Sequence, residues 1–271
     1  MAQQVVGKIK RAGPPIRVGA LIGISSLALS IILLLWPGSS VLERLRWLDS
    51  GICAQIASHS FYPGGERLPL CARNTGIYLG FCMTLIGLFI MGRGRAHRFP
   101  AQMVLGVLVA GVLLLVIDGV NSFLLDLGLP HLYQPQNVLR LLTGLLTGMA
   151  MAAIILPVLN GFCWRDYDDS QTIRSWRELG IFVGVLLVCF CAVITLSGLI
   201  LYPIALLSTS GLVMTVGCVN LVPLLALSKR DSQLTRYRQL LPFFGLACAC
   251  ALGELLLLAQ AKFWLLHSLG I

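Results

Sequence analysis

Ionisable side chains stand inside apolar stretches of this sequence at four positions. Arg73 and Arg140 each come one helical turn before a pair of glycines, and Asp118 and Glu254 lie within other apolar segments. Guanidinium groups bind carboxylates and phosphates through paired hydrogen bonds. If these side chains meet in space, they would either tie helices together or form a site for a small anion or an anionic lipid headgroup.

Cysteine chemistry is the second possibility. Cys53 and Cys71 fall in a segment expected outside the cell, where an oxidising environment permits a disulfide. His59 lies between them, but three ligands are fewer than the four of a structural zinc site. We therefore predict a disulfide first, free thiols second, and no metal or other cofactor. The other thiols lie in or near apolar segments and are expected to pack as small hydrophobic groups; they are Cys82, Cys163, Cys189, Cys191, Cys218, Cys248 and Cys250.

The composition identifies the class of protein that must position these groups. Of 271 residues, 57% are hydrophobic and 11% are charged, and the mean hydropathy is +0.88. Soluble domains carry about 25% charged residues. The chain is therefore an integral membrane protein with the lipid bilayer as its partner, and we expect it in a bacterial plasma (inner) membrane. The net charge of +9 comes with no nucleic-acid motif, so no nucleic-acid partner is predicted.

The apolar segments predict an all-α, polytopic transmembrane helix bundle that forms one domain over residues 1–271. About 20 apolar residues cross the hydrocarbon core. Because no cleavage site follows the first segment, we interpret it as an uncleaved span rather than a signal peptide. The seven expected spans cover roughly 17–36, 75–92, 101–125, 137–160, 179–202, 205–227 and 240–266.

The basic residues predict the orientation. With a cytoplasmic N-terminus, 14 of the 20 lysines and arginines lie in inner segments, and the outer ones are Arg44, Arg46, Arg67, Arg73, Arg140 and Lys262. The positive-inside rule favours this arrangement, which leaves the C-terminus outside. This orientation depends on a break between the fifth and sixth spans near Tyr202-Pro203. One continuous element there would reverse the membrane orientation of all the segments that follow.

The first outer loop contains about 38 residues. Ser40 followed by Glu43 is a capping-box pattern, and apolar residues recur at helical spacing up to Ile56. We predict a short amphipathic surface helix over 40–57.

Polar residues from four spans are expected at one depth, near the outer surface. A charged group within the hydrocarbon costs about 2.5–3.5 kcal/mol, so Asp118 and Glu254 should face the bundle interior, with Arg73 and Arg140 as partners. GxxxG patterns at Gly76–Gly80 and Gly144–Gly148 would let two of these helices approach closely. The predicted outward-facing site consists of Arg73, Asn74, Tyr78, Asp118, Asn121, Asn137, Arg140 and Glu254.

Several motifs resemble a bacterial family of predicted membrane proteins that is known only as a domain of unknown function. They are GIC-AQ, SHSFYPGG, LPLCARNTGIYLGF, IDG and NVLRLLTGLLTG, within residues 50–160. Many members of this family carry Cys-His-Gln and Cys-x-Arg-Cys, a set that implies metal or redox chemistry. This chain has Ala54 and Asn74 at two of those positions, whereas the arginine, the IDG aspartate and the N-x-x-R segment are retained.

Three functions remain open from the sequence. The first is an outward-facing ionic pocket that binds or transports a small anionic solute or lipid headgroup. The second is an enzyme at the outer face, acting by thiol-redox chemistry or on a lipid-linked substrate, for which no catalytic residues can be named. The third is a structural or assembly subunit of a membrane complex, whose protein partners the sequence does not identify.

Overall fold

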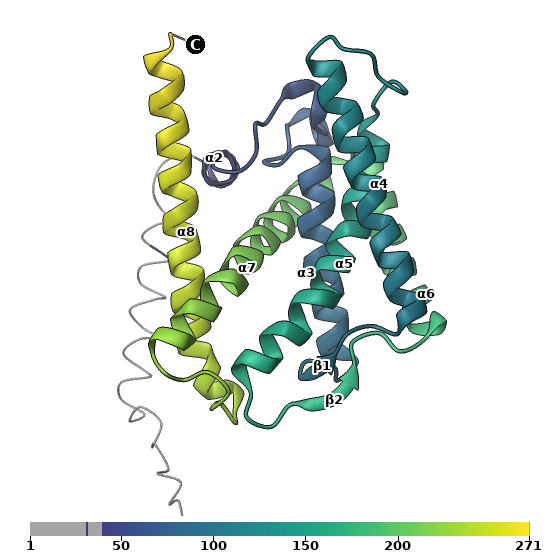
Figure 1. The fold of residues 1–271 in the computed structure, drawn as a ribbon. Coiled ribbons are helices and arrows are strands. Elements are labelled where there is room, and N and C mark those ends of the chain that lie inside the picture. Colours follow the sequence, from purple (N-terminus) through teal and green to yellow (C-terminus); the bar gives the residue numbers. More distant parts are fainter. Residues whose placement is uncertain (1–30, 32–39, 271) are drawn as a thin grey trace, which may run out of the picture.

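The computed structural model describes Ile31 and residues 40–270, so the first predicted span, 17–36, lies outside the described residues except for Ile31. Six described helices are long and apolar enough to cross a membrane, which confirms the all-α polytopic bundle (Figure 1). They are α3 (Ala72–Ile90), α4 (Gln102–Asp126), α5 (Asn137–Cys163), α6 (Trp176–Ile194), α7 (Leu201–Leu227) and α8 (Tyr237–Ser268).

The break between α6 and α7 exists, but it comes earlier than predicted. Helix α6 ends at Ile194, and Leu196 takes a positive φ of 54° that stops the helix. The short 3₁₀ helix η3 (Gly198–Ile200) then leads into α7. Pro203 lies in the first turn of α7, where its missing N–H leaves no helical hydrogen bond unmade, so it does not interrupt the span.

The surface helix α2 (Val41–Asp49) begins as predicted. The backbone N–H of Glu43 donates to Ser40 Oγ at 3.2 Å, and the Ser40 N–H donates to Glu43 Oε2 at 3.3 Å. This reciprocal pair is the capping box expected from the sequence.

The same helix ends at Asp49, well before the predicted residue 57. Gly51 lies so close to α8 that a Cβ there would come within 3.3 Å of the Ala259 backbone nitrogen. The chain then turns through Gln55 at a φ of 56°. Ile56, assigned to the apolar face of the longer helix, is 43% exposed as a result. Contact with α8, which the local pattern does not reveal, shortens the helix.

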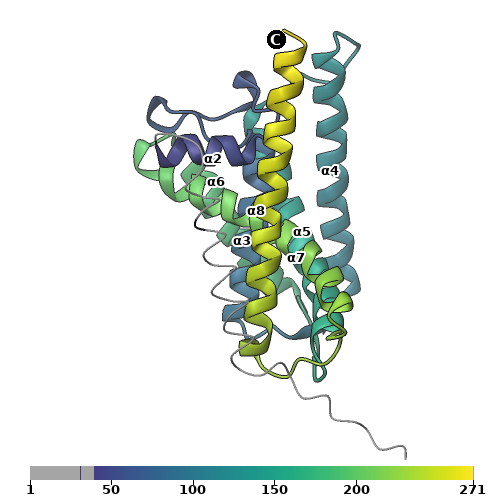
Figure 2. The same cartoon turned by 90° about the vertical axis from the view of Figure 1, so that its left-hand side faces the viewer.

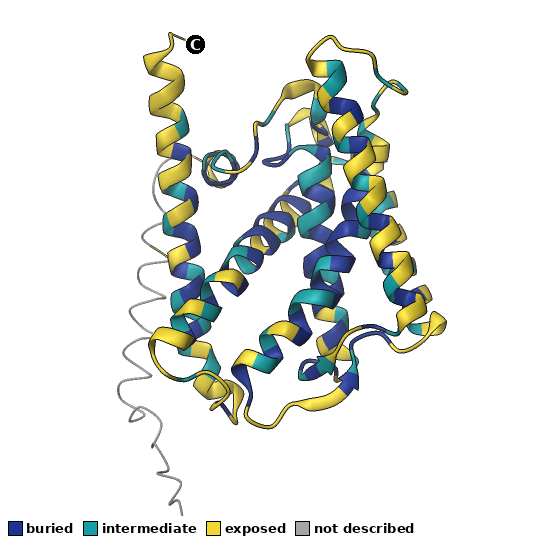
Figure 3. Cartoon of the chain, in the orientation of Figure 1, coloured by how far each residue is buried: buried dark blue, intermediate teal, exposed yellow. Residues whose placement is uncertain are grey.

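Helices α3 and α5 form the central pair, and their glycines allow the close approach that the two GxxxG patterns predict. A Cβ at Gly76 would lie 3.0 Å from the Cα of Gly144, and one at Gly148 would lie 2.6 Å from the backbone nitrogen of Phe81. In Figure 3, most residues of α3 and α5 are coloured as buried or intermediate, whereas α4 and α8 carry long exposed stretches. The seam between α3 and α5 is therefore the core of the bundle.

The two ends of the bundle differ in their loops (Figures 1 and 2). The end expected outside, called the outer end below, carries α2 and the short helices η1 (Ala57–His59) and η2 (Pro63–Gly65). At the opposite, inner end, β1 (Ala96–Arg98) pairs in parallel with β2 (Asp168–Gln171).

Candidate functional site

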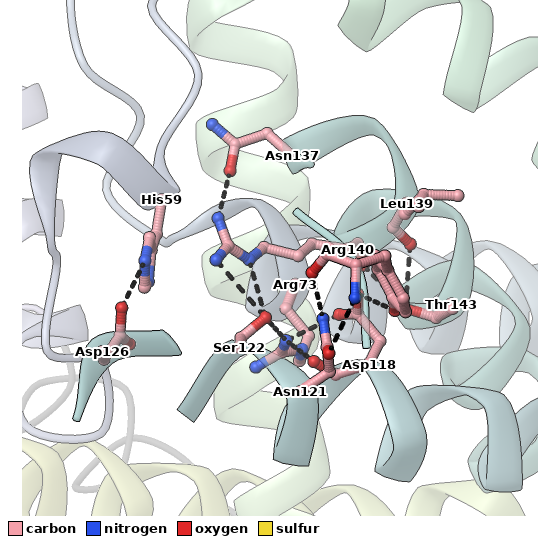
Figure 4. A network of polar contacts seen from close by, with 11 residues as sticks. His59, Arg73, Asp118, Asn121, Ser122, Asp126, Asn137, Leu139, Arg140 and Thr143 are labelled. Carbon is pink, nitrogen blue, oxygen red and sulfur yellow. Dashed lines mark hydrogen bonds and ion pairs between the residues drawn. The ribbon is translucent and has the colours of Figure 1, made fainter. Parts of the chain in front are cut away.

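The residues predicted to share one site divide among three places. Arg73 lies on the side of α3 that faces α4 and α5, and it meets Asp118 and Arg140 there through a shared serine (Figure 4). Asn74 and Tyr78 belong to another side of the same helix. Glu254 lies on α8, apart from both. We call the first group the ionic cluster; it consists of Arg73, Asp118, Ser122, Tyr133, Asn137 and Arg140.

Arg73 and Asp118 form an ion pair between α3 and α4. Arg73 Nη2 lies 2.6 Å from Asp118 Oδ2 and also donates to the Asp118 carbonyl at 3.2 Å. The Tyr133 hydroxyl donates to the other carboxylate oxygen at 2.9 Å. The Asp118 side chain is only 2% exposed, whereas that of Arg73 is 23% exposed. Both oxygens of this buried acid are therefore satisfied, and water can reach part of the arginine.

Arg140 enters the same cluster from the first turn of α5 and is buried. Its guanidinium donates to Asn137 Oδ1 at 2.8 Å and to Ser122 Oγ at 3.3 and 3.4 Å. The same serine oxygen accepts from Arg73 Nη2 at 3.1 Å. Two guanidinium groups therefore converge on one hydroxyl.

The buried part of the cluster carries an excess of positive charge. Among residues 40–270, no carboxylate lies within 4.0 Å of the Arg140 guanidinium. Asp118 forms its ion pair with Arg73 and not with Arg140. Arg73 Nε is also buried without a hydrogen-bond partner. Asp126 contributes negative charge only from the rim, where its side chain is 41% exposed.

The outer loop covers this cluster. Asn137 Nδ2 donates to the carbonyls of Ser58 and Ser60 at 3.0 and 3.3 Å. His59 Nε2 lies 3.4 Å from Asp126 Oδ1. Burial, followed by the charge of Arg140, lowers the pKa of His59 below its usual 6.5. The lowered pKa favours the neutral imidazole at pH 7, so His59 adds no positive charge to the cluster.

Asn121 was predicted to be part of the polar site, but its side chain binds the backbone of a loop. Its amide oxygen accepts from the backbone N–H groups of Leu132 and Tyr133 at 2.7 and 3.3 Å, and its nitrogen donates to the Tyr133 carbonyl at 2.8 Å. The Asn121 side chain therefore stabilises the loop between α4 and α5. Its effect on the ionic cluster is indirect, since it holds Tyr133 beside Asp118.

Asn74 and Tyr78 lie with the thiols rather than with the ions. The Asn74 side chain helps to lower the pKa of Cys53, and Tyr78 packs in the apolar cluster that contains Cys53 and Cys71. One helix, α3, therefore separates two polar groups that the sequence places at the same depth.

The prediction that Glu254 faces the bundle interior is wrong. The residue is exposed, and its carboxylate accepts from Asn220 Nδ2 of α7 at 3.1 Å. Leu252 and Leu255 take the buried positions on this turn of α8. The depth of a residue along a helix does not determine its rotation about the helix axis.

Three residues that matter here are absent from the predicted set. Ser122 comes four residues after Asp118 and so lies on the same helical face, a signal that the sequence contained. Tyr133 is in a loop, and nothing local indicates its partner. Asp49 is completely buried beside the thiols although it ends an amphipathic surface helix.

Two hollows in the described surface lie outside the ionic cluster. One of about 580 Å³ at the inner end is bordered by His97, Pro157 and Phe162. The other, of about 330 Å³, lies between α2 and the outer part of α8, bordered by Trp47 and Lys262. Neither hollow is bordered by a residue of the ionic cluster.

Comparison with known proteins agrees with the resemblance seen in the motifs. Residues 53–154 match the family model described as "Predicted membrane protein (DUF2085)". The chain is also similar to the uncharacterized protein MJ1492 of Methanocaldococcus jannaschii, with 27% identity over 107 residues. The aligned part covers 40% of this chain and 63% of that protein, which is less than two thirds of its length. No solved structure matches. The matched region contains Arg73, Asp118 and Arg140. Neither the description of the family nor that of the archaeal protein names an activity.

Proposed function

We propose that the ionic cluster binds the anionic group of a small solute or of a lipid headgroup at the outer face of the membrane. The excess positive charge carries this proposal: Arg73 and Arg140 share one hydroxyl, while a single buried carboxylate contacts one of them. In a low dielectric, an uncompensated charge is costly, and an anion between the two guanidinium groups would offset that cost.

Exposure supports the same proposal. Arg73 keeps 23% of its side-chain surface, so an anion can reach it without the helices separating. Its buried Nε, which has no partner, is a donor that an anion would satisfy after a small movement of the side chain. A purely structural tie would be expected to pair each arginine with its own carboxylate.

The test is the thermal stability of the full chain in detergent, with inorganic phosphate compared with chloride at equal ionic strength. An anion that binds only the folded state stabilises it by about 2.7 kcal/mol when its concentration is 100 times its Kd. Arg140→Gln should remove this stabilisation. Arg98→Gln is the matched control, because Arg98 is an exposed arginine at the inner end.

A second arm identifies the source of the anion. The same variants are reconstituted in bilayers of phosphatidylglycerol or of phosphatidylcholine. If phosphate raises the thermal stability in detergent and the two lipids give the same stability, the ligand is a solute. If phosphatidylglycerol alone raises the thermal stability, and only when Arg140 is present, the ligand is a lipid headgroup. Equal effects of phosphate and chloride, or equal effects on both variants, would leave the arginines as interhelical ties and refute binding.

A further inference from the structure

The two outer cysteines lie against each other at the N-terminus of α3. The backbone N–H of Cys71 donates to the Cys53 sulfur at 3.3 Å, which brings the two thiols close together. Cys53 is 3% exposed, whereas Cys71 is only partly buried. A pair that is close enough to share a proton and is reachable at one sulfur can undergo thiol–disulfide exchange.

The surroundings favour a thiolate at Cys53. The Cys71 thiol and backbone, the Gln55 backbone and the Asn74 side chain all donate to it, and together they lower its pKa to about 6. The hydrogen bond to that thiolate raises the pKa of Cys71, so one proton is shared by the two sulfurs at pH 7. Cys71 also caps the N-terminus of α3, where the helix dipole favours negative charge.

A buried carboxyl group lies beside the pair. Asp49 has no exposed surface; its Oδ2 accepts from the Thr209 hydroxyl at 2.8 Å, and its Oδ1 has no hydrogen-bond partner. Burial raises the pKa of Asp49 well above its usual value, and the charge of Cys53 raises it further. A carboxyl group with a raised pKa binds a proton more readily than an exposed one. No part of the proposed anion binding uses it.

From this arrangement we propose that Cys53 and Cys71 form a redox-active dithiol that exchanges electrons with disulfide compounds at the outer face, with Asp49 as the proton acceptor. This activity uses none of the residues to which anion binding is assigned.

The exchange balances in two steps. The Cys71 sulfur, having passed its proton to Cys53, attacks one sulfur of a disulfide R–S–S–R; an S–S bond forms and one R–S⁻ leaves. The Asp49 carboxylate then takes the proton from Cys53, whose thiolate attacks the Cys71 sulfur and releases the second R–S⁻. The two protein sulfurs lose two electrons, the two R groups gain them, and the proton passes from Asp49 to solvent.

The experiment equilibrates the full-length protein in detergent with mixtures of oxidised and reduced glutathione. Free thiols are then trapped by alkylation, and peptides are mapped by mass spectrometry. We expect a Cys53–Cys71 disulfide, lower in mass by two hydrogens, that closes in the oxidised mixtures and reopens in the reduced ones. Cys53→Ser should leave a glutathione adduct on Cys71. Cys250→Ser, an exposed cysteine on α8, is the matched control and should behave as the unchanged protein.

Asp49→Asn tests the proton acceptor while keeping both thiols. General acid–base catalysis contributes about 10²–10⁴-fold, so closure should slow by at least about tenfold, with the glutathione ratio at half closure unchanged. A disulfide that stays closed in every mixture would make the pair a structural crosslink, and thiols that stay free in every mixture would remove the exchange altogether. An unchanged closure rate in Asp49→Asn would exclude Asp49 from the step.

Discussion

Arginines at the two ends of the bundle are neutralised in different ways. At the inner end, Arg93 pairs with Glu178 at 2.6 Å and Arg98 binds Asp169 through two nitrogens. Arg95 stacks over the ring of Trp164 at 4.1 Å. Each of these three arginines has its own counterpart, so their roles are complete within the chain.

In the ionic cluster at the outer end, two arginines are accompanied by one buried acid. Asp118 contacts Arg73, and Arg140 is left with an amide oxygen and a shared hydroxyl. The difference teaches that an arginine buried near a membrane surface is not by itself a sign of binding. The proposed binding rests instead on a buried cation that no carboxylate of the described residues contacts.

The largest effect is expected from Asp118→Asn, which removes the one buried acid of the outer cluster. Breaking a buried pair leaves an uncompensated charge and costs about 3 kcal/mol, at the low end of the usual range because Arg73 is partly exposed. Chemical denaturation in detergent would measure the free energy of unfolding. Asp169→Asn, in the fully exposed inner pair, should cause no measurable change. Equal losses in both variants would contradict the contrast between the ends.

Gly144→Ala should have the second largest effect on stability, because it pushes α3 away from α5 directly below Arg73. A Cβ at this position would come within 3.0 Å of the Ile77 backbone nitrogen, and overpacking of this kind costs about 2 kcal/mol. The phosphate-dependent rise in Tm should disappear with it. Gly106→Ala, where a Cβ meets nothing within 4 Å, is the control and should keep both properties. Retained phosphate protection in Gly144→Ala would show that the cluster tolerates helix separation.

Ser122→Ala removes the hydroxyl shared by the two guanidinium groups. Losing hydrogen bonds to charged donors should lower the free energy of unfolding by about 1 kcal/mol, since water reaching Arg73 can replace part of the contact. At the inner end, the exposed Ser228 bonds only to carbonyls of its own helix, and Ser228→Ala should be close to neutral. Urea titrations of both variants make the comparison, and a neutral Ser122→Ala would refute convergence on the hydroxyl.

The smallest effect concerns the titration of His59. Burial, the largest cause of its lowered pKa, stays in place, and Arg140→Gln removes only the second cause, so the pKa should rise but remain below its usual value. Because the folded-state pKa lies below the unfolded value, His59 contributes stability above pH 6.5 that is lost as the pH falls through the folded-state pKa. NMR of histidine-labelled protein would follow the ring. Arg98→Gln, at the far end, should leave this titration unchanged.

Much of the fold was predictable because the bilayer imposes it. The length of each apolar segment predicted the described spans to within a few residues, except at the end of α6 and around α2. Ser40 and Glu43 correctly indicated a capping box, and the paired GxxxG patterns indicated the α3–α5 seam. The pairing of Arg73 with Asp118 also followed from depth, because a buried acid in hydrocarbon requires a cation.

The sequence by itself determined the class of protein and the positions of the described spans along the chain, because the length and hydropathy of each segment show whether it can cross a bilayer. Only the tertiary structure decided how each helix is rotated about its own axis, and therefore which residues face its neighbours. Arg73 and Asn74 are adjacent in sequence yet belong to different clusters, and Glu254 turns outward. Lipid tails and helix interfaces are equally apolar, so composition does not distinguish the side of a helix that faces its neighbours; packing does.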